Sequence, residues 1–368
     1  MNKKILIVSA SFYPMNSPRS FRTTELVKEF SRQGHEVTVL ISKDTTNHPK
    51  FEKEHNVKIN NLGSLKYKRI NLNSGSRIAK LIKRLLRRSL DLFFHYPNIE
   101  WMFKVKRRLR NEKNYDLLIS VAAPHAIHWG VAWAWNKKKS IANIWVADCG
   151  DPFMGTTTDT FKKMFYFKYI EKWWCRKADF ISVPFSGAID GYYKQFHQKI
   201  KVIPQGFNFE ELVINKEAYV PNKIPTFAYA GGLIPGVRDP KKLIEYLLDQ
   251  KKEFKFIFYT NSIPMISSFL KKAKGKIEVR DYIPRNDLIL ELSKMDFVVN
   301  FANAVATQLP SKLIDYYLTK RPVLSIESYS LDKEVIKEFL EGNYTNKYKF
   351  HDSEQYRIEN VCQQFLTL

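Results

Sequence analysis

The chain opens with Lys4-Ile5-Leu6-Ile7-Val8-Ser9, a run of aliphatic residues with polar residues on both sides. The run is too short to span a bilayer, and polar residues follow at once. It therefore predicts a first buried β-strand rather than a signal peptide. The segment from Arg19 to Gln33 has a helical pattern and ends at Gly34, a residue favoured at helix C-termini. A second strand is predicted from Glu36 to Ser42, where β-branched residues alternate with others.

The same alternation of strands and helices continues along the chain. Further strands are predicted at Asp116–Ser120, Asn143–Ala147, Phe180–Val183, Lys201–Pro204, Thr226–Ala230, Phe254–Thr260, Lys276–Ile283, Asp296–Phe301 and Pro322–Ile326. Two prolines and the lack of a helical period mark Asn215–Pro225 as a linker between domains. The pattern predicts an α/β protein with two doubly wound, Rossmann-like domains that face a central cleft.

The expected domains are residues 1–214, residues 224–350 and a terminal helix at 351–368 that packs back on the first domain. Parallel sheets of this kind bind ligands beyond the carboxyl ends of their strands. The loops that follow the predicted strands are therefore the first place to look for a functional site.

Positive charge dominates the composition, with 60 Lys and Arg against 37 acidic residues and a net charge of +23. Such an excess indicates a nucleic acid, an anionic membrane surface or phosphorylated substrates as partners. Three cysteines, Cys149, Cys175 and Cys362, have spacings that fit neither a metal motif nor a disulfide framework. The chain is expected to be cytosolic.

About half of the excess charge lies in one insertion, residues 66–113, which has fifteen Lys and Arg against three acidic residues. Its first part predicts an amphipathic helix with one apolar face, formed by Ile78, Leu81, Ile82, Leu85, Leu86 and Phe93. A basic face and nearby aromatic residues are typical of a helix that lies on an anionic membrane. The alternative is a helix that packs on the sheet with a solvated basic face. Membrane contact is assigned to Lys80, Arg84, Arg87, Arg88, Arg107 and Arg108.

Several segments, in the right order over nearly the whole chain, resemble glycosyltransferase family 4, whose members are retaining enzymes of the GT-B fold. The similar segments are Ile5–Val8 with Phe12–Pro14, Gly34–Val37, Val202–Phe207, Phe227–Gly232, Val279–Pro284 and Pro310–Leu324. The resemblance implies an N-terminal acceptor domain and a C-terminal donor domain. It also implies transfer of a hexose or N-acetylhexosamine from a UDP-, GDP- or dTDP-sugar, without a cofactor or a metal. The chain differs from the family at one position: Thr307 stands where the family has the first carboxylate of an acidic pair.

For the donor, we expect a diphosphate site built from backbone amides, a helix N-terminus and cations. Gly231 and Gly232 allow close approach of backbone to phosphate. The resemblance makes Arg238 and Lys312 the cations, and Asp315 the acceptor of both ribose hydroxyls. The expected donor-binding residues are Gly231, Gly232, Arg238, Pro310, Ser311, Lys312 and Asp315. A well-capped helix with solvated side chains is the alternative.

In the first domain, His125, Asp148 and Asp151 follow predicted strands and are the catalytic candidates. His125 is expected to bind the donor sugar or to lie near the acceptor hydroxyl, and one of the two aspartates to polarise that hydroxyl. Arg19 and Arg22 begin the first helix and are the candidates for an acceptor pyrophosphate. Each of these residues also has a structural alternative, such as helix capping or solvation.

The basic insertion beside the acceptor domain indicates a lipid-linked or oligosaccharide acceptor in the synthesis of bacterial surface polysaccharide, such as lipopolysaccharide or capsule. The protein is then expected to be peripheral on the inner face of the cytoplasmic membrane. Three alternatives stay open: a nucleic-acid-binding protein, a nucleotide-sugar 2-epimerase of the same fold and an inactive assembly subunit. No nucleic-acid recognition motif supports the first, and Thr307 in place of an acid disfavours the second.

Overall fold

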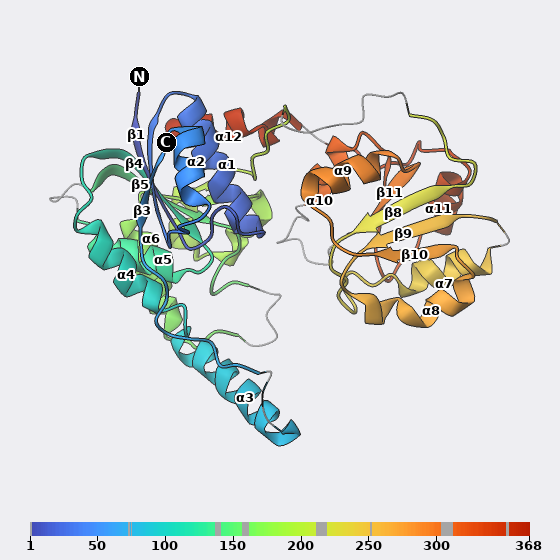
Figure 1. Cartoon of the computed structure of the whole chain (residues 1–368), viewed down its shortest axis with the longest axis horizontal. Helices are drawn as coiled ribbons and strands as arrows, with labels where there is room; N and C mark the ends of the chain where they lie inside the picture. Colours follow the sequence, from blue (N-terminus) through green and yellow to red (C-terminus); the bar gives the residue numbers. More distant parts are fainter. Residues whose placement is uncertain are drawn as a thin grey trace. The chain divides into compact units, whose positions relative to one another are not determined.

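The computed structural model describes residues 2–72, 74, 76–136, 141–156, 162–210, 219–250, 252–302, 312–350 and 353–368. The chain divides into two compact units. Unit 1 is Met1–Phe207 with Gln355–Leu368, and unit 2 is Asn208–Glu354. Each unit is a parallel sheet with helices between its strands (Figure 1), which confirms the predicted α/β class with two doubly wound halves.

In the described part of unit 1, the sheet has seven strands in the order β3-β2-β1-β4-β5-β6-β7. The strands are β1 (Lys4–Ser9), β2 (Glu36–Ile41), β3 (Lys58–Asn61), β4 (Tyr115–Ala122), β5 (Ala142–Cys149), β6 (Phe180–Val183) and β7 (Ile200–Val202). The helices are α1 (Pro18–Arg32), α2 (His48–His55), α3 (Arg77–Phe94), α4 (Glu100–Leu109), α5 (Ala126–Ala134) and α6 (Phe167–Lys177), with 3₁₀ turns at Ser186–Gly191 and Lys194–Lys199.

Each face of this sheet has its own apolar core, because successive residues of a strand point to opposite faces. Leu6 and Val8 of β1 pack with residues of α4, α5 and α6, including Trp129 and Trp174. Ile5 and Ile7 pack on the other face with α1 and α2. A strand buried on both faces reads as a continuous apolar run, which is why β1 is recognisable in the sequence.

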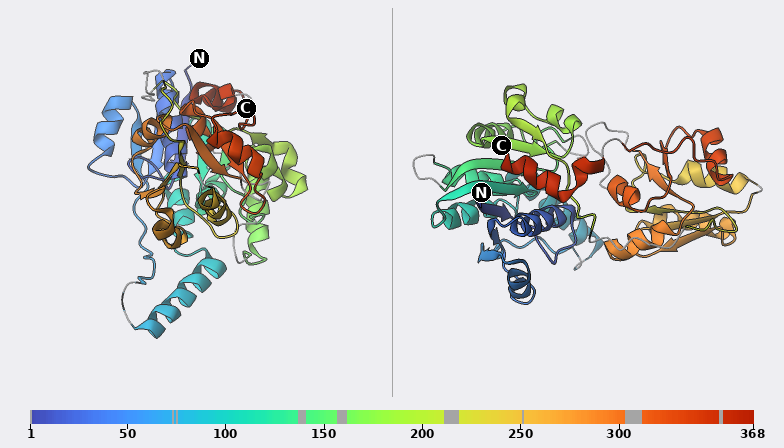
Figure 2. Two further views of the ribbon diagram at one scale, coloured as in Figure 1. Left: turned by 90° about the vertical axis from the view of Figure 1, so that its right-hand side faces the viewer. Right: turned by 90° about the horizontal axis from the view of Figure 1, so that it is seen from above.

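The terminal helix α12 (Ile358–Leu366) follows a 3₁₀ turn at Ser353–Tyr356 and packs on unit 1, as predicted. Val361 and Phe365 join the core beside α1, and Figure 2 shows the red helix against unit 1. The outgoing and returning segments meet at Phe207, whose amide donates to Tyr356 O over 2.9 Å. Gly206 permits this meeting, since a Cβ there would lie 2.5 Å from Ile358 Cδ1.

Helix α3 stands apart from the sheet of unit 1 (Figure 1), and no described residue of it is buried. Its apolar stripe is exposed, from 42% at Phe93 to 72% at Ile78. The alternative in which this helix packs on the sheet is therefore wrong. Arg84, Arg87 and Arg88 are exposed and Lys80 is half-buried. On α4, Arg107 is exposed, whereas Arg108 Nε lies 3.7 Å from Glu112 Oε1.

In its described residues, unit 2 has five strands in the order β10-β9-β8-β11-β12. They are β8 (Thr226–Ala230), β9 (Lys255–Tyr259), β10 (Ile277–Arg280), β11 (Phe297–Phe301) and β12 (Val323–Ile326). The helices are α7 (Lys241–Asp249), α8 (Ser267–Ala273), α9 (Arg285–Ser293), α10 (Lys312–Leu318) and α11 (Lys333–Leu340), with a 3₁₀ turn at Ile263–Met265. Stacked phenylalanines fill one face, with ring centroids of Phe227 and Phe297 4.4 Å apart.

The helix α2 and the edge strand β3 have no counterpart in the prediction from sequence. Helix α2 is eight residues long, and β3 is a four-residue edge strand with Ile59 as its buried residue. Segments this short, with one apolar anchor, carry too little periodicity to stand out. Among the described residues, no helix combines the length and the apolar content needed to cross a membrane.

Candidate active site

The strand order of unit 1 indicates where a ligand is expected to bind. From β1 the chain continues to β2 on one side, whereas β4 pairs on the other side of β1. The connections after β1 and β4 therefore run in opposite directions, and doubly wound sheets bind ligands at that switch point. The loop after β1 leads to Arg19 and Arg22 on α1, and the loop after β4 leads to His125.

A buried ion pair organises this edge of the sheet. The Asp148 carboxylate, at the end of β5, accepts hydrogen bonds from Arg22 Nε over 3.1 Å and Arg22 Nη2 over 2.8 Å. Ser182 Oγ donates to the same carboxylate over 2.7 Å. Burial raises the pKa of Asp148, but the charge and hydrogen bonds of Arg22 outweigh it, so the net pKa is below its usual value. Asp148 is ionised and only 1% exposed.

Arg22 is also held by backbone carbonyls that directly follow β7. Its guanidinium donates to the carbonyls of Ile203 and Pro204 as well as to Asp148, and its side chain is 3% exposed. These contacts give Arg22 and Asp148 a positioning role, in place of the direct contacts with an acceptor that we expected from sequence. Sequence alone could not show this, because the partners lie on three different elements.

Arg19 is the arginine of α1 that reaches the surface of this region. Its Nη1 lies 3.9 Å from Asp148 Oδ2, and its side chain is 22% exposed. The guanidinium rests on Gly150, where a Cβ would come within 2.6 Å of Arg19 Cζ. Burial lowers the pKa of Arg19, and the charge of Asp148 counters that effect. Of the two arginines expected to bind an acceptor anion, Arg19 is therefore the one that reaches the surface, and its guanidinium lies over Gly150.

His125 directly precedes α5 and is 7% exposed. Its Nε2 lies 3.2 Å from the carbonyl oxygen of Asp151. A carbonyl only accepts, so Nε2 carries the proton and Nδ1 is left as an acceptor. Among the described residues, Nδ1 has no hydrogen-bond partner. Burial, and then the nearby His95, lowers the pKa of His125 to about 3, so the ring is neutral at physiological pH.

His128, one helical turn further, is buried, and both of its ring nitrogens have partners. Its Nδ1 lies 2.8 Å from Ser120 Oγ and its Nε2 lies 3.3 Å from Cys149 Sγ. His125, His128 and Cys149 offer ligand atoms within 4.8 Å of one another. Since both ring nitrogens of His128 already have partners, we assign this group to packing beneath the site rather than to metal binding.

Asp151 is the exposed carboxylate of the predicted pair. Its backbone fixes His125 through the carbonyl, while its side chain stays at the surface. Of the two aspartates considered for polarising an acceptor hydroxyl, only Asp151 has an exposed side chain. Unit 1 thus brings Arg19, His125 and Asp151 to one edge of the sheet, with Arg22 and Asp148 beneath them.

The sheet of unit 2 has a switch point of the same kind. Strand β8 lies between β9 and β11, so the switch point falls between the loops after β8 and β11. Gly231 and Gly232 follow β8, and Gly231 has φ of 128°, a conformation that favours glycine. Tyr229 Oη donates to Gly232 O over 2.8 Å and stiffens the turn. Tyr316 of α10 accepts from the Ala230 amide over 3.0 Å, which ties that helix to this loop.

Arg238 lies beside the glycine turn. Its backbone pairs with Ile234, the Arg238 amide donating to Ile234 O over 2.9 Å. Burial raises the pKa of Tyr229, at the end of β8, and the charge of Arg238 opposes the rise. Arg238 Nε is buried and has no hydrogen-bond partner in the described part of the chain. A buried N–H donor without an acceptor is a group whose hydrogen bond a ligand oxygen or a water molecule can complete.

Asp315, on α10, accepts a hydrogen bond from Arg285 Nε over 2.7 Å. The Arg285 Nη2 group also lies 2.6 Å from Asp315 Oδ1. Reasoning from sequence missed Arg285, although its place directly after Pro284 at the start of α9 is visible in the chain. Pro310 and Ser311 lie outside the described residues, as do Thr307 and the side chain of Lys312. Of the residues proposed at this helix N-terminus, Asp315 is therefore the one whose side chain the structure describes.

A known protein family matches part of this chain. The model of Glycosyltransferase Family 4 matches residues 21–211, slightly more than half of the chain. No curated protein sequence matches the chain.

Solved structures match over the full length. A glycosyltransferase from Rickettsia africae is 13% identical with a TM-score of 0.62, covering 100% of this chain and 98% of that one. TarM is 12% identical with a TM-score of 0.63, covering 100% and 98%. HepE of Anabaena, solved with UDP-glucose, is 11% identical with a TM-score of 0.57, covering 100% and 99%. At these identities the likeness shows the fold, two doubly wound units of the GT-B type.

Proposed function

This chain belongs to glycosyltransferase family 4, and on that premise we propose that it transfers a hexose or N-acetylhexosamine from a nucleotide diphosphate sugar to a lipid-linked glycan. Unit 2 binds the donor and unit 1 binds the acceptor. The acceptor belongs to a bacterial surface polysaccharide, and the protein works on the inner face of the cytoplasmic membrane.

The observation that carries the donor assignment is the unpartnered Nε of Arg238 beside the Gly231–Gly232 turn. A diphosphate supplies the acceptors that this donor lacks, and the glycines let backbone amides approach phosphate oxygens. HepE of Anabaena, which shares the fold, was solved with UDP-glucose. Asp315 is the candidate for the ribose hydroxyls. Its ion pair with Arg285 fixes the carboxylate before the ligand binds.

The acceptor assignment rests on His125 and Arg19. The neutral His125 ring has an acceptor nitrogen, Nδ1, that is buried and has no partner among the described residues, and a sugar hydroxyl that enters beside it can donate a hydrogen bond to it. Arg19 supplies the cation for an acceptor phosphate, with Asp148 pairing with it from below and Arg22 holding Asp148. A lipid-linked acceptor carries such a phosphate next to its first sugar.

We infer a retaining reaction on one face of the donor sugar. The acceptor oxygen forms a bond to the anomeric carbon while the bond from that carbon to the diphosphate oxygen breaks. The leaving diphosphate oxygen takes the acceptor proton, so no strong protein base is needed. Arg238 stabilises the charge that develops on the diphosphate, together with Lys312 as expected from sequence.

We assign membrane attachment to α3. Its exposed leucines and isoleucines lie along one side, and arginines and lysines along the other. Exposing an apolar stripe of this size to water is unfavourable, and burying it in the interfacial region of a bilayer lowers the free energy. Anionic headgroups attract the cations of the opposite face.

The decisive test is a thermal-shift screen with UDP-, GDP- and dTDP-glucose and with the matching N-acetylglucosamine donors. At a hundredfold excess over Kd, ligand binding stabilises the folded state by about 2.7 kcal/mol, a rise in Tm of several degrees. We expect one nucleotide class to raise Tm, the Arg238→Gln variant to lose the shift and the control Lys241→Gln to keep it. If no activated sugar raises Tm, the proposed function is wrong.

A further inference from the structure

Glu171 of α6 is a buried carboxylate of unit 1, with 0% of its surface exposed. Among the described residues, no Lys or Arg forms an ion pair with it, and its Oε2 atom has no hydrogen-bond partner. Burial raises the pKa of Glu171 to about 7, against the opposing hydrogen bonds of the Met154 and Phe153 amides. Burying such a group is unfavourable, so its role is to be found in the contacts that it makes.

Glu100 of α4 shows what a second buried carboxylate of unit 1 does. It accepts hydrogen bonds from the amides of Lys66 and Tyr67, each over 2.7 Å, and Lys104 Nζ lies 3.3 Å from its Oε1 atom. Burial raises the pKa of Glu100, but the two amides and Lys104 outweigh it, so the net pKa is below its usual value. Both carboxylates thus bind backbone amides of a loop, and of the two only Glu171 does so without a cation.

The amides that Glu171 binds belong to the loop between β5 and α6. Glu171 Oε1 accepts from the Met154 amide over 3.2 Å. The loop continues to Gly155, where a Cβ would lie 2.1 Å from Gly191 O, so the backbone there packs directly on the 3₁₀ turn that Gly191 ends. In turn, a Cβ at Gly191 would lie 2.3 Å from Pro152 Cγ. The loop is therefore held by two elements, α6 and this turn.

The same loop fixes the ring of His125. The carbonyl oxygen of Asp151 lies 3.2 Å from His125 Nε2, and the ring centroids of Phe153 and His125 are 5.0 Å apart. Because a carbonyl only accepts, it keeps the proton on Nε2 and leaves Nδ1 as an acceptor. The loop also carries the exposed side chain of Asp151. A shift of the loop would therefore release the tautomer of His125 and move Asp151 together.

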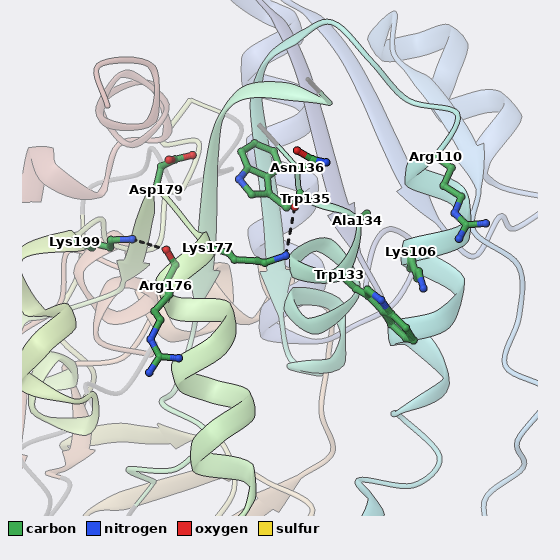
Figure 3. A pocket seen from close by; sticks show the side chains of 10 residues that line it. All are labelled: Lys106, Arg110, Trp133, Ala134, Trp135, Asn136, Arg176, Lys177, Asp179 and Lys199. Atoms are coloured by element: carbon green, nitrogen blue, oxygen red, sulfur yellow. Dashed lines mark hydrogen bonds between the residues drawn. The ribbon is translucent and has the colours of Figure 1, made fainter. Parts of the chain in front are cut away.

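Helix α6 is itself anchored at its C-terminal end, which fixes Glu171 relative to α5. Lys177 Nζ donates to Ala132 O of α5 over 2.7 Å. Lys199 Nζ donates to Arg176 O over 3.0 Å, and Figure 3 shows this contact in the open pocket that both residues line. These lysines satisfy carbonyl groups that the ends of helices leave unpaired. The helix that carries the carboxylate and the helix that follows the candidate histidine are thus joined directly.

We propose that Glu171 is a positioning residue of the candidate active site. From α6 it holds the Met154 end of the loop, so that the Asp151 carbonyl keeps the His125 proton on Nε2 and leaves Nδ1 for a sugar hydroxyl. The sugar hydroxyl rests on the proposed function, whereas the tautomer of His125 is a property of the protein without a ligand. The neutral form of Glu171 suffices for this role, because an amide N–H needs only one oxygen acceptor.

The test compares Glu171→Leu, which removes both oxygen atoms, with Glu171→Gln, which keeps one as an acceptor. Glu100→Leu is the matched control, since it also removes a buried carboxylate that binds two loop amides. Nuclear magnetic resonance of the full chain with isotope-labelled histidine, at pH 6.5, reports the tautomer of each ring. The variant His125→Phe identifies the signals of His125. Hydrogen exchange followed by mass spectrometry reports the protection of residues 150–155.

We expect His125 to carry its proton on Nε2 in the wild type, in Glu171→Gln and in Glu100→Leu. In Glu171→Leu we expect both tautomers, and exchange of residues 150–155 at least about tenfold faster than in the wild type. Turnover of Glu171→Leu should fall as far as that of His125→Phe, with donor affinity within about twofold of wild type because unit 2 is unchanged.

Three results overturn the proposal. The first is a wild-type ring of His125 with its proton on Nδ1, which decides the matter even if the leucine variant does not fold. The second is a Glu171→Leu variant that keeps the wild-type tautomer, and the third is a Glu171→Gln variant that loses it. Failure of the proposed function is recognised separately, since no activated sugar then raises Tm while the tautomer and exchange measurements still decide the role of Glu171.

Discussion

Arg22 and Asp148, 126 positions apart in the chain, form a buried two-pronged ion pair at the end of β5. Each side chain is at most 3% exposed. Ser182 and the carbonyls of Ile203 and Pro204 satisfy the remaining polar atoms of the pair. The pair joins α1, β5 and β6 with the end of β7, and it holds Arg19 at the surface of the candidate active site.

Removing one partner of this pair is expected to destabilise unit 1. Asp148→Asn leaves the Arg22 charge buried without a counter-ion, a change that typically costs about 3–5 kcal/mol. Urea unfolding at pH 7 measures the loss, and Asp190→Asn, an exposed acid of the same unit, is the control. An equal effect of the two variants would contradict the assigned role.

Acid sensitivity is expected from His95, whose ring packs on Trp129 and Phe153. Burial lowers the pKa of His95 to about 4. Below pH 6.5 the unfolded chain therefore binds a proton that the folded chain does not, and stability falls as pH drops from 6.5 towards 4. His95→Phe should reduce that slope by about 1.4 kcal/mol per pH unit at most. Urea unfolding at pH 4.5, 5.5 and 6.5 tests this, and an unchanged slope would disprove it.

His125→Phe is expected to lower turnover by about tenfold, because it removes the acceptor of one hydrogen bond from a sugar hydroxyl. Donor binding, followed by thermal shift, should stay within a factor of two or so of wild type, since the donor residues are in unit 2. The matched control is His197→Phe, since the ring of His197 instead contacts Tyr192 O. Full activity of the His125 variant would remove this residue from the mechanism.

Gly150→Ala is expected to act through Arg19. The added Cβ would meet the Arg19 guanidinium at 2.6 Å, and a flexible side chain moves more readily than backbone. We expect a stability loss below about 1 kcal/mol, and a rise in acceptor KM like that of Arg19→Gln. Steady-state kinetics at fixed donor concentration measures both variants. A KM that changes in Arg19→Gln alone would show that Gly150 does not position the arginine.

Helix α3 is expected to bind anionic vesicles through both of its faces. Arg84→Gln/Arg87→Gln/Arg88→Gln should weaken binding by about 100-fold at low salt, at about 1 kcal/mol for each cation. Leu81→Ser/Leu85→Ser should weaken binding at high salt as well, because the apolar contribution is not screened. Co-sedimentation with vesicles is compared with retention of DNA. Loss of DNA binding without loss of vesicle binding would favour the nucleic-acid alternative.

Sequence patterns predicted the strands of both sheets, except β3, and the alternation of these strands with helices. This was possible because a strand buried on two faces is a continuous apolar run, and a covering helix repeats every 3.6 residues. Such signals are local, so a single sequence reveals them. The edge strand β3 and the short helix α2 escaped, because each has too few buried residues to form a pattern.

The sequence by itself thus determined the α/β class, the two-unit organisation, the return of the terminal helix and the residues that gather at the strand ends. Only the tertiary structure decided that Arg22 and Asp148 form a buried ion pair and that His125 keeps a buried nitrogen without a partner among the described residues. The side chains of Arg19 and Asp151 reach the surface, which the tertiary structure decided as well. It also decided that α3 stands away from the sheet. The physical reason is that periodicity records the two faces of an element, whereas burial depends on partners distant in the chain, which a local pattern does not contain.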